Sequence, residues 1–229
     1  MSSIRTYLVA VVCFIGLSGA AFAIAPDFMD KLDADSRPAE DKSRDGARRP
    51  YQVMMLLGVE EGMTVVDVRA GGGWYTRVLS AAVGPGGKVF AQGVRGGGEA
   101  LAAELGNVEA VADLAEIEAG VADVAVTALN IHHSNAQSGV EHISGILRVL
   151  KPGGVAAIID HVGDPAMNNA QLHRVPTADV RAWILEAGFE IVEESDILRQ
   201  NADDHTLSAT DSRLGRNPDR FLFVVRKPR

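Results

Sequence analysis

The stretch that decides the fold is "VVDVRAGGGWYT", residues 65–76. It opens on an apolar run that contains Asp67, passes through the glycines at 71–73 and resumes with an aromatic pair. A buried strand that turns tightly into a helix has this layout, because glycine accepts positive φ and lets the backbone approach a ligand closely. Arg69 stands where the first glycine of such a turn usually lies. The stretch therefore predicts a strand, a ligand-binding turn and a helix, with one unusual residue in the turn.

The same alternation of apolar runs and helical stretches continues along the chain. We predict strands at 63–68, 88–92, 108–112, 123–129, 155–160, 189–194 and 220–225. We predict helices between them at 75–82, 99–105, 138–150 and 177–187, each able to place apolar residues on one face. This order is typical of an α/β fold, in which helices cover both faces of a parallel sheet. Residues 200–218 show no convincing helix, so they predict an antiparallel final strand pair or a long loop, either a lid or a disordered surface segment.

The composition of the chain excludes some classes of function. The 229 residues are 47% hydrophobic and 23% charged, which is typical of one globular domain with a sizeable core. The formal charge of -8 and the lack of a basic patch argue against a nucleic-acid partner. We therefore expect a small-molecule substrate, while the sequence does not indicate an oligomeric state.

The N-terminal residues resemble a secretory signal peptide. Arg5 precedes an apolar stretch at 7–17, and Ala21-Phe22-Ala23 gives a small-residue cleavage site. The alternative is an uncleaved membrane anchor, but the strongly apolar part is shorter than the ~20 residues of a spanning helix. We predict an exported, periplasmic protein with a signal peptide at 1–23, a charged lead-in and linker at 24–47, and one domain at 48–229. After cleavage no stable membrane insertion is expected.

Several motifs together resemble the class I S-adenosylmethionine-dependent methyltransferases. They are "VVDVRAGGG" at 65–73, "NVEAVADLAEI" at 107–117, "ADVAVTALNIHHS" at 122–134 and "LKPGG" at 150–154. More narrowly, "GGGWYTRVLSAAVGPGGKVFAQ", "LNIHH", "IIDH" and "DRFLFVVRKP" look like an exported bacterial branch of predicted methyltransferases. The resemblance covers about residues 48–228 and implies a Rossmann-like, doubly wound, seven-stranded sheet whose last strand is antiparallel.

The resemblance implies S-adenosylmethionine as the cofactor. Asp67, Gly71 and Gly73 would hold its methionine end, and Asp113 would lie beside the adenine. The expected cofactor surface is completed by Arg69, Gln92 and Asn130. The sequence departs from the family pattern in two places. Arg69 replaces a glycine and would either crowd the methionine arm or offer its guanidinium to the carboxylate. Gln92 ends the second strand, where the family usually has an acid that receives the ribose hydroxyls.

Two neighbouring strands end in residues suited to proton transfer. Asn130, His132 and His133 follow one strand, and Asp160 and His161 end the next. Histidine titrates near neutral pH and suits a general base, so we expect His133 or His161 as the base, with His132 and Asp160 beside them. The alternatives are histidines that only shape the pocket, or a metal site. An adjacent His-His pair seldom lets both rings reach one ion, so we predict no metal ligands.

Three hypotheses follow for the function. The first is methyl transfer from S-adenosylmethionine to a small acceptor that the sequence does not identify. The second is a non-catalytic binding protein that keeps the methyltransferase fold. The third is a hydrolase or isomerase that uses the His/Asp cluster, with or without a metal.

Overall fold

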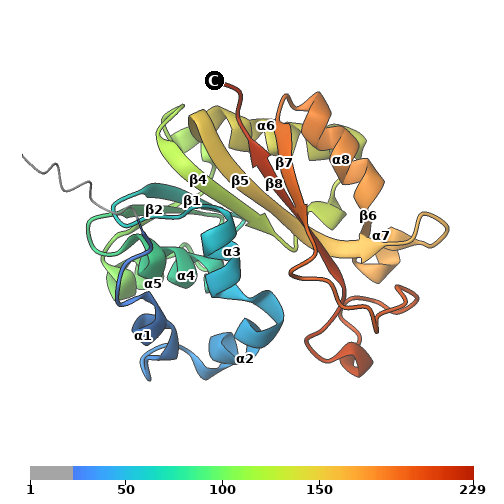
Figure 1. Cartoon of the computed structure of the whole chain (residues 1–229), viewed down its shortest axis with the longest axis horizontal. Helices are drawn as coiled ribbons and strands as arrows, with labels where there is room; N and C mark the ends of the chain where they lie inside the picture. The colour runs from blue at the N-terminus through green and yellow to red at the C-terminus, as the bar shows by residue number, and fades with distance from the viewer. Residues whose placement is uncertain (1–22) are drawn as a thin grey trace, which may run out of the picture.

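A computed structural model describes residues 23–229 and shows one mixed sheet between two helical layers (Figure 1). The strand order is β3-β2-β1-β4-β5-β8-β7. The strands are β1 (Thr64–Val68), β2 (Lys88–Gln92), β3 (Val108–Val111), β4 (Ala122–Ala128), β5 (Leu150–Gly163), β7 (Glu190–Ser195) and β8 (Arg220–Arg226). Strands β1 to β5 pair in parallel, whereas β8 is antiparallel to both β5 and β7. The predicted fold class is confirmed, including the antiparallel last strand.

The sheet has one strand more than predicted. β6 (Val175–Pro176) is a two-residue strand that pairs with the end of β5. It is too short to give an apolar run, so the sequence pattern does not reveal it. β5 is also longer than predicted at both ends: Leu150 already pairs with Ala122 of β4 before a register irregularity, and the strand continues to Gly163, where it pairs with β6.

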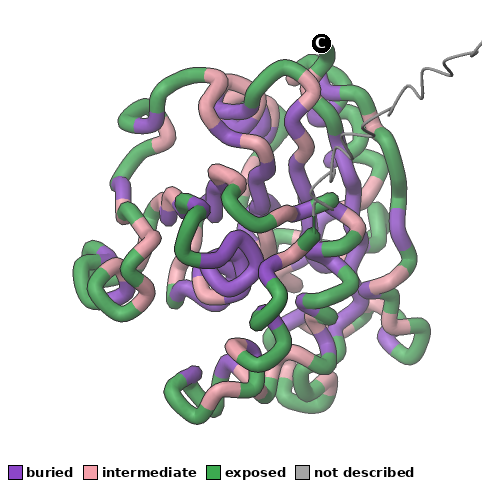
Figure 2. The backbone as a smooth tube through the Cα atoms, turned by 60° about the vertical axis from the view of Figure 1, so that its left-hand side comes forward, coloured by how far each residue is buried: buried purple, intermediate pink, exposed green. Residues whose placement is uncertain are grey.

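Helices cover both faces of the sheet. One core cluster joins β1 to α1 (Phe28–Asp33), α3 (Pro50–Leu56) and α4 (Trp74–Val83). The other cluster packs α6 (Ala136–Val149) and α8 (Thr177–Glu186) against the opposite face. The short α5 (Glu99–Leu105) packs beside β3, at the edge of the sheet. Buried residues concentrate on the central strands and on the inward sides of these helices (Figure 2).

Residues 24–47 are not a linker, and that prediction is corrected. After the short helix α1, the chain forms α2 (Ala39–Arg48), which packs on the domain through polar contacts. Trp74 Nε1 donates to the backbone oxygen of Asp41 at 3.0 Å, and the buried Arg37 pairs with Asp45. A helix that packs through charged and polar side chains shows little apolar periodicity, so its sequence pattern is typical of a linker. The expected signal peptide lies, except for Ala23, outside the described residues.

The long segment between β7 and β8 is anchored by buried ion pairs. Arg174 donates two hydrogen bonds to Asp203, at 2.8 and 3.0 Å, and Asp203 in turn accepts from the backbone N–H of Asp219. Asp219 also accepts hydrogen bonds from Arg199 and His205. These contacts give the segment a fixed path without a regular helix, so it is not a disordered surface loop. No helix among residues 23–229 has the length and apolar character to cross a membrane.

Candidate active site

The site lies where the strand order reverses, at the carboxyl ends of β1 and β4. In open α/β sheets this is the place where ligands bind, because the loops leave a crevice there. The turn after β1 takes positive φ at Arg69 (54°), Gly71 (57°) and Gly73 (81°). Arg69 thus adopts a conformation that suits glycine and costs a larger residue ~1 kcal/mol or more.

Gln92 holds this turn in place. Its Oε1 accepts a hydrogen bond from the Arg69 backbone N–H at 2.9 Å, and its Nε2 donates to the backbone oxygen of Ala112 at 2.8 Å. The side-chain amide therefore bridges β1 and β3 across the end of β2. Each of its polar atoms has one partner within the protein, so Gln92 braces the turn at the place of the expected ribose-binding acid, while Oε1 keeps a second lone pair and Nε2 a second hydrogen.

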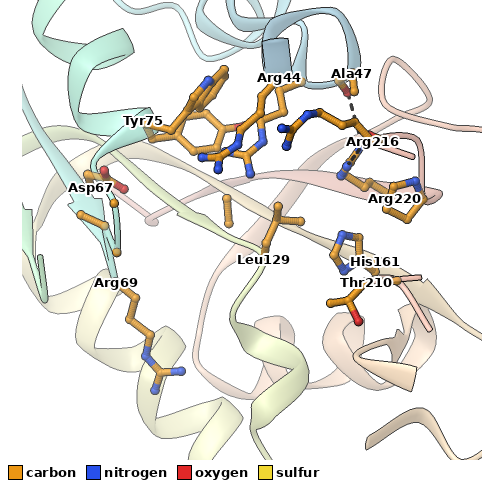
Figure 3. A pocket seen from close by; sticks show the side chains of 18 of the residues that line it. Arg44, Ala47, Asp67, Arg69, Tyr75, Leu129, His161, Thr210, Arg216 and Arg220 are labelled. Carbon is orange, nitrogen blue, oxygen red and sulfur yellow. Dashed lines mark hydrogen bonds between the residues drawn. The ribbon is translucent and has the colours of Figure 1, made fainter. Parts of the chain in front are cut away.

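A cavity of about 420 Å³ opens beside this turn (Figure 3). Its floor includes Asp67, Gly71 and Gly72, and its wall includes Tyr75 and His161. The roof comes from the end of α2 and from the segment 209–220, which lie far apart in the sequence. Arg220 joins the two parts of the roof, because Nη1 donates to the backbone oxygen of Ala47 at 3.3 Å.

The cavity is strongly cationic. Six arginines line it, namely Arg44, Arg48, Arg69, Arg95, Arg216 and Arg220, against a single carboxylate, Asp67. Within residues 23–229, only Arg44 of these six has a carboxylate oxygen within 4.0 Å. Burial, reinforced by the charge of Arg48, lowers the pKa of Arg220 to about 10, and its Nε has no hydrogen-bond partner among the described residues. Such uncompensated charge is costly, and an anionic ligand would relieve it.

Asp67 is the buried acid of the floor. It is 3% exposed, and burial raises its pKa to about 7. The hydroxyl of Thr76 donates to Asp67 Oδ2 at 2.6 Å, which favours the ionised form and opposes part of that shift. Near neutral pH the carboxyl is therefore poised between its two protonation states.

Asp160 organises the ends of β4 and β5. It is fully buried and accepts from the backbone N–H groups of His132 (3.0 Å) and His161 (2.7 Å) and from His132 Nδ1 (2.8 Å). His161 lines the cavity, and its Nδ1 donates to the backbone oxygen of His173 at 3.2 Å. That bond leaves the lone pair on Nε2. Burial lowers the pKa of His161 to about 4, so the ring is neutral at physiological pH.

The predicted residues divide into three groups. Asp67, Arg69, Gly71 and His161 line the cavity. His132 and Asp160 lie next to His161, and His133 lies next to His132, but none of the three lines the cavity. Gly73 is also outside the lining, and a Cβ at that position would meet Leu101 at 2.6 Å. The third group, Gln92, Asn130 and Asp113, makes contacts within the protein. Asn130 braces the ends of β1 and β4, and Asp113 caps a short 3₁₀ helix through the backbone N–H of Ala115 at 2.7 Å.

Sequence reasoning missed the arginine roof. Arg44 lies in the segment interpreted as linker, and Arg48 is the first residue of the predicted domain. Arg216 lies in the segment in which no helix was predicted, and Arg220 begins the last predicted strand. Their density in "SRDGARRP" and "GRNPDR" was the only available signal, and a run of charge usually marks a solvated surface.

No family model and no curated protein matches the chain, whereas many solved structures share its fold. A methyltransferase from Aquifex aeolicus, described as S-adenosylmethionine-dependent, is 23% identical with a TM-score of 0.61 over 89% of this chain and 98% of that one. The [4+2]-cyclase SpnF is 17% identical with a TM-score of 0.62 over 90% and 86%. A "possible exported protein" from Bordetella parapertussis is 19% identical with a TM-score of 0.56 over 92% and 75%. The chain therefore has the fold of the class I S-adenosylmethionine-dependent methyltransferases.

Proposed function

We propose that this protein transfers a methyl group from S-adenosylmethionine to a small acidic acceptor. The observation that carries the proposal is the cavity itself, which opens from the glycine-rich turn after β1 at the switch point of a methyltransferase fold. The resemblance of the motifs and the fold of the solved structures support methyl transfer. Fold alone does not determine chemistry, so the residues of the cavity have to be judged separately.

The cavity fits the methionine end of the cofactor. Gly71 supplies the positive φ of 57° that the turn at the floor requires, and it places no side chain toward the ligand. The ionised Asp67 can accept hydrogen bonds from an ammonium group, while an arginine can pair with the carboxylate. The fit at the ribose is weaker, because Gln92 offers a neutral amide where an acid usually receives the ribose hydroxyls, and each of its polar atoms already has one partner within the protein. We therefore expect S-adenosylmethionine to bind mainly through its amino-acid end.

The bound cofactor would supply an electrophilic methyl group, and the protein would position the acceptor. Tyr75 and His161 flank the space between the floor and the arginine roof. His161 lines the cavity and His133 does not, so of the two expected bases we propose His161 as the acceptor of the proton, although its pKa of about 4 makes it a weak base. Alignment of donor and acceptor would give most of the rate gain in such a transfer.

The roof indicates the chemistry of the acceptor. Arg48, Arg216 and Arg220 have no carboxylate partner within residues 23–229 and face the same space. A ligand with carboxylate or phosphate groups would satisfy these guanidinium groups through paired hydrogen bonds. An acidic acceptor would also offset the positive charge of the sulfonium, which is otherwise unfavourable in this cavity.

Titration calorimetry with S-adenosylmethionine tests the proposal. We expect saturable binding by the wild type, at least tenfold weaker binding by Asp67→Asn, and unchanged binding by Asp123→Asn. Asp123 is a matched control because it lies at the opposite end of β4, where it pairs with Lys151. No heat of binding up to millimolar cofactor would remove the methyltransferase proposal.

The second candidate is a binding protein that retains the fold. Two observations favour it: an amide, Gln92, stands where an acid usually receives the ribose hydroxyls, and the excess of arginines in the cavity disfavours a cation. Under this hypothesis the protein binds an acidic small molecule but not S-adenosylmethionine. Separate calorimetric titrations with citrate and with S-adenosylmethionine distinguish the two, because only the binding protein would bind the acid and show no binding of the cofactor.

Export to the periplasm is a separate part of the proposal. The support is the signal-like N-terminal sequence and the fold shared with the Bordetella parapertussis protein. Cell fractionation combined with N-terminal sequencing of the mature protein tests it. A chain that begins at Ile24 in the periplasm is expected, and an intact Met1 in the cytoplasmic fraction would refute export.

A further inference from the structure

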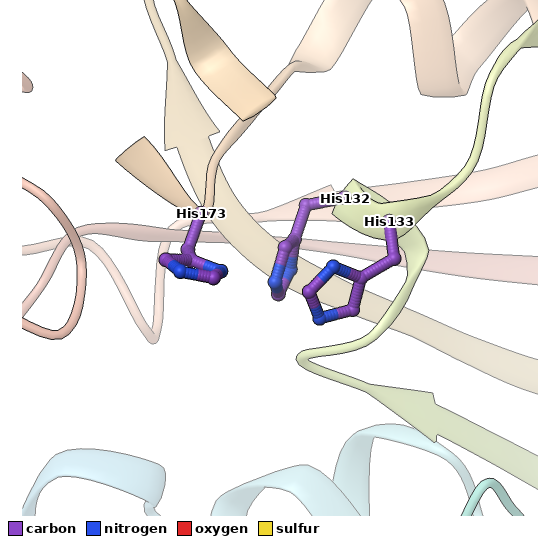
Figure 4. Close-up of side chains that lie close together, drawn as sticks. All are labelled: His132, His133 and His173. Carbon is purple, nitrogen blue, oxygen red and sulfur yellow. The ribbon is translucent and has the colours of Figure 1, made fainter. Parts of the chain in front are cut away.

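Three imidazole rings converge beside the cavity (Figure 4). His132 and His133 come from the 3₁₀ turn Ile131–His133 after β4, and His173 follows α7 (Asn169–Leu172). One nitrogen from each ring lies within 4.8 Å of the other two. The ring centroids are 4.1 Å apart for His132 and His133 and 5.6 Å apart for either ring and His173. The triangle is therefore small enough for one ion to contact all three side chains.

The orientation of His132 is fixed by a buried carboxylate. Asp160, which is fully buried, accepts from His132 Nδ1 at 2.8 Å and from the backbone N–H of the same residue at 3.0 Å. An ionised carboxylate can accept hydrogen bonds but cannot donate them, so Nδ1 of the imidazole carries the proton and Nε2 keeps its lone pair. A histidine whose second nitrogen donates to a carboxylate is the arrangement that orients metal-binding imidazoles in proteins.

His173 is held by a rigid segment. It takes a positive φ of 52°, which is uncommon for a residue other than glycine, and its backbone oxygen accepts from His161 Nδ1. The next residue, Arg174, is fully buried and donates to the backbone oxygen of Val162 at 2.9 Å and to the carboxylate of Asp203. These bonds fix the backbone on both sides of the ring. Backbone strain of this kind persists only where the surroundings enforce it.

We propose that His132, His133 and His173 form a binding site for a divalent transition-metal ion such as Zn²⁺. Three imidazoles without a thiol suit Zn²⁺, Ni²⁺ or Cu²⁺, and three protein ligands leave a coordination position open to water or substrate. In a tetrahedral zinc site the ligand nitrogens lie roughly 3.3 Å apart. His133 is exposed and makes no side-chain hydrogen bond to residues 23–229, so its rotation can close the remaining distance.

The site is distinct from the arginine cavity and does not depend on methyl transfer. None of its three ligands lines that cavity, and His161 lies between the two, with its ring centroid 5.9 Å from that of His132. From the sequence we predicted no metal ligands, because an adjacent His-His pair such as His132 and His133 seldom lets both rings reach one ion. The third imidazole is brought in by the path of the chain between β5 and α8.

Metal titration of the full chain, purified without a polyhistidine tag, tests the site. We expect one equivalent of Zn²⁺ to bind with a dissociation constant in the micromolar range or below, and Co²⁺ to give a visible absorption band typical of a low-coordinate ion. His133→Ala and His173→Ala should each weaken Zn²⁺ binding at least ~100-fold, and Asp160→Asn should weaken it by ~10- to 100-fold.

His142→Gln is the matched control. His142 contacts Thr127 at 3.0 Å within the fold and lies outside the triangle, so Zn²⁺ affinity should be unchanged. His133→Ala removes an exposed ring that makes no side-chain hydrogen bond and should leave the thermal melting temperature of the metal-free protein unchanged. No saturable binding to the wild type, or unchanged binding in both His133→Ala and His173→Ala, would overturn the proposal.

Discussion

The buried acid of the cavity floor makes a quantitative prediction about stability. Burial raises the pKa of Asp67 from 3.8 to about 7. Each unit of difference between the folded and unfolded pKa corresponds to about 1.4 kcal/mol, so the full effect is of order 4 kcal/mol. The folded chain binds the proton more tightly than the unfolded chain. The contribution of Asp67 to the free energy of unfolding is therefore fully present below about pH 4 and is lost as the pH rises toward 7 and above.

Asp67→Asn removes this dependence while keeping the size of the side chain. Urea unfolding of wild type and variant between pH 4 and pH 8 measures the difference in unfolding free energy, in which the other titrating groups cancel. As the pH rises from 4 to 8, we expect the unfolding free energy of the variant to increase by several kcal/mol relative to that of the wild type. Thr76→Val should move the transition to higher pH, because it removes the hydrogen bond that favours ionised Asp67. Parallel wild-type and Asp67→Asn curves would refute the reasoning.

Three further predictions concern packing, ion pairing and charge. Gly73→Ala should lower the unfolding free energy by ~1–3 kcal/mol, because the new Cβ would meet Leu101 at 2.6 Å and the backbone φ is 81°. Gly72→Ala is the control and should have little effect on stability, since no atom lies within 4 Å of a Cβ at that position. Arg174→Met should cost ~3 kcal/mol or more in thermal or urea unfolding, because it leaves the buried carboxylate of Asp203 without its cation. If the cavity binds the cofactor, S-adenosylhomocysteine, which lacks the sulfonium charge, should bind more tightly than S-adenosylmethionine in calorimetry, and the gap should narrow as salt screens the arginines.

The sheet could be predicted because its signals are local. Each of the seven predicted strands is an apolar run bounded by turn residues, and the glycine-rich turn after β1 indicates where that strand ends and a helix begins. α2 carries no comparable signal, since it docks through Asp41 and Asp45 rather than through an apolar face. A helix of this kind is visible only once its partners, Trp74 and Arg37, are in place.

The cavity was harder to predict because its two sides are far apart in the sequence. The hydrogen bond from Arg220 to the backbone of Ala47 spans 173 residues, and neither local sequence indicates the other. The same holds for the histidines, since His132 and His133 meet His173 only through the return of the chain after β5. The sequence thus predicts single residues at strand ends, whereas charge clusters and ligand sets depend on long-range contacts.

The first irregularity in the sequence, Arg69, now has a structural explanation. Its positive φ is maintained because Gln92 accepts from its backbone N–H, and its guanidinium reaches the backbone oxygen of Asn130 at 3.4 Å, away from the floor at Asp67. An acid at position 92 would keep the first bond but lose the donation to the backbone of Ala112. The two departures from the family pattern are therefore coupled, because Gln92 holds the backbone of Arg69 in the turn. Any ligand of this cavity has to gain its affinity from the acid on the floor and the arginines of the roof.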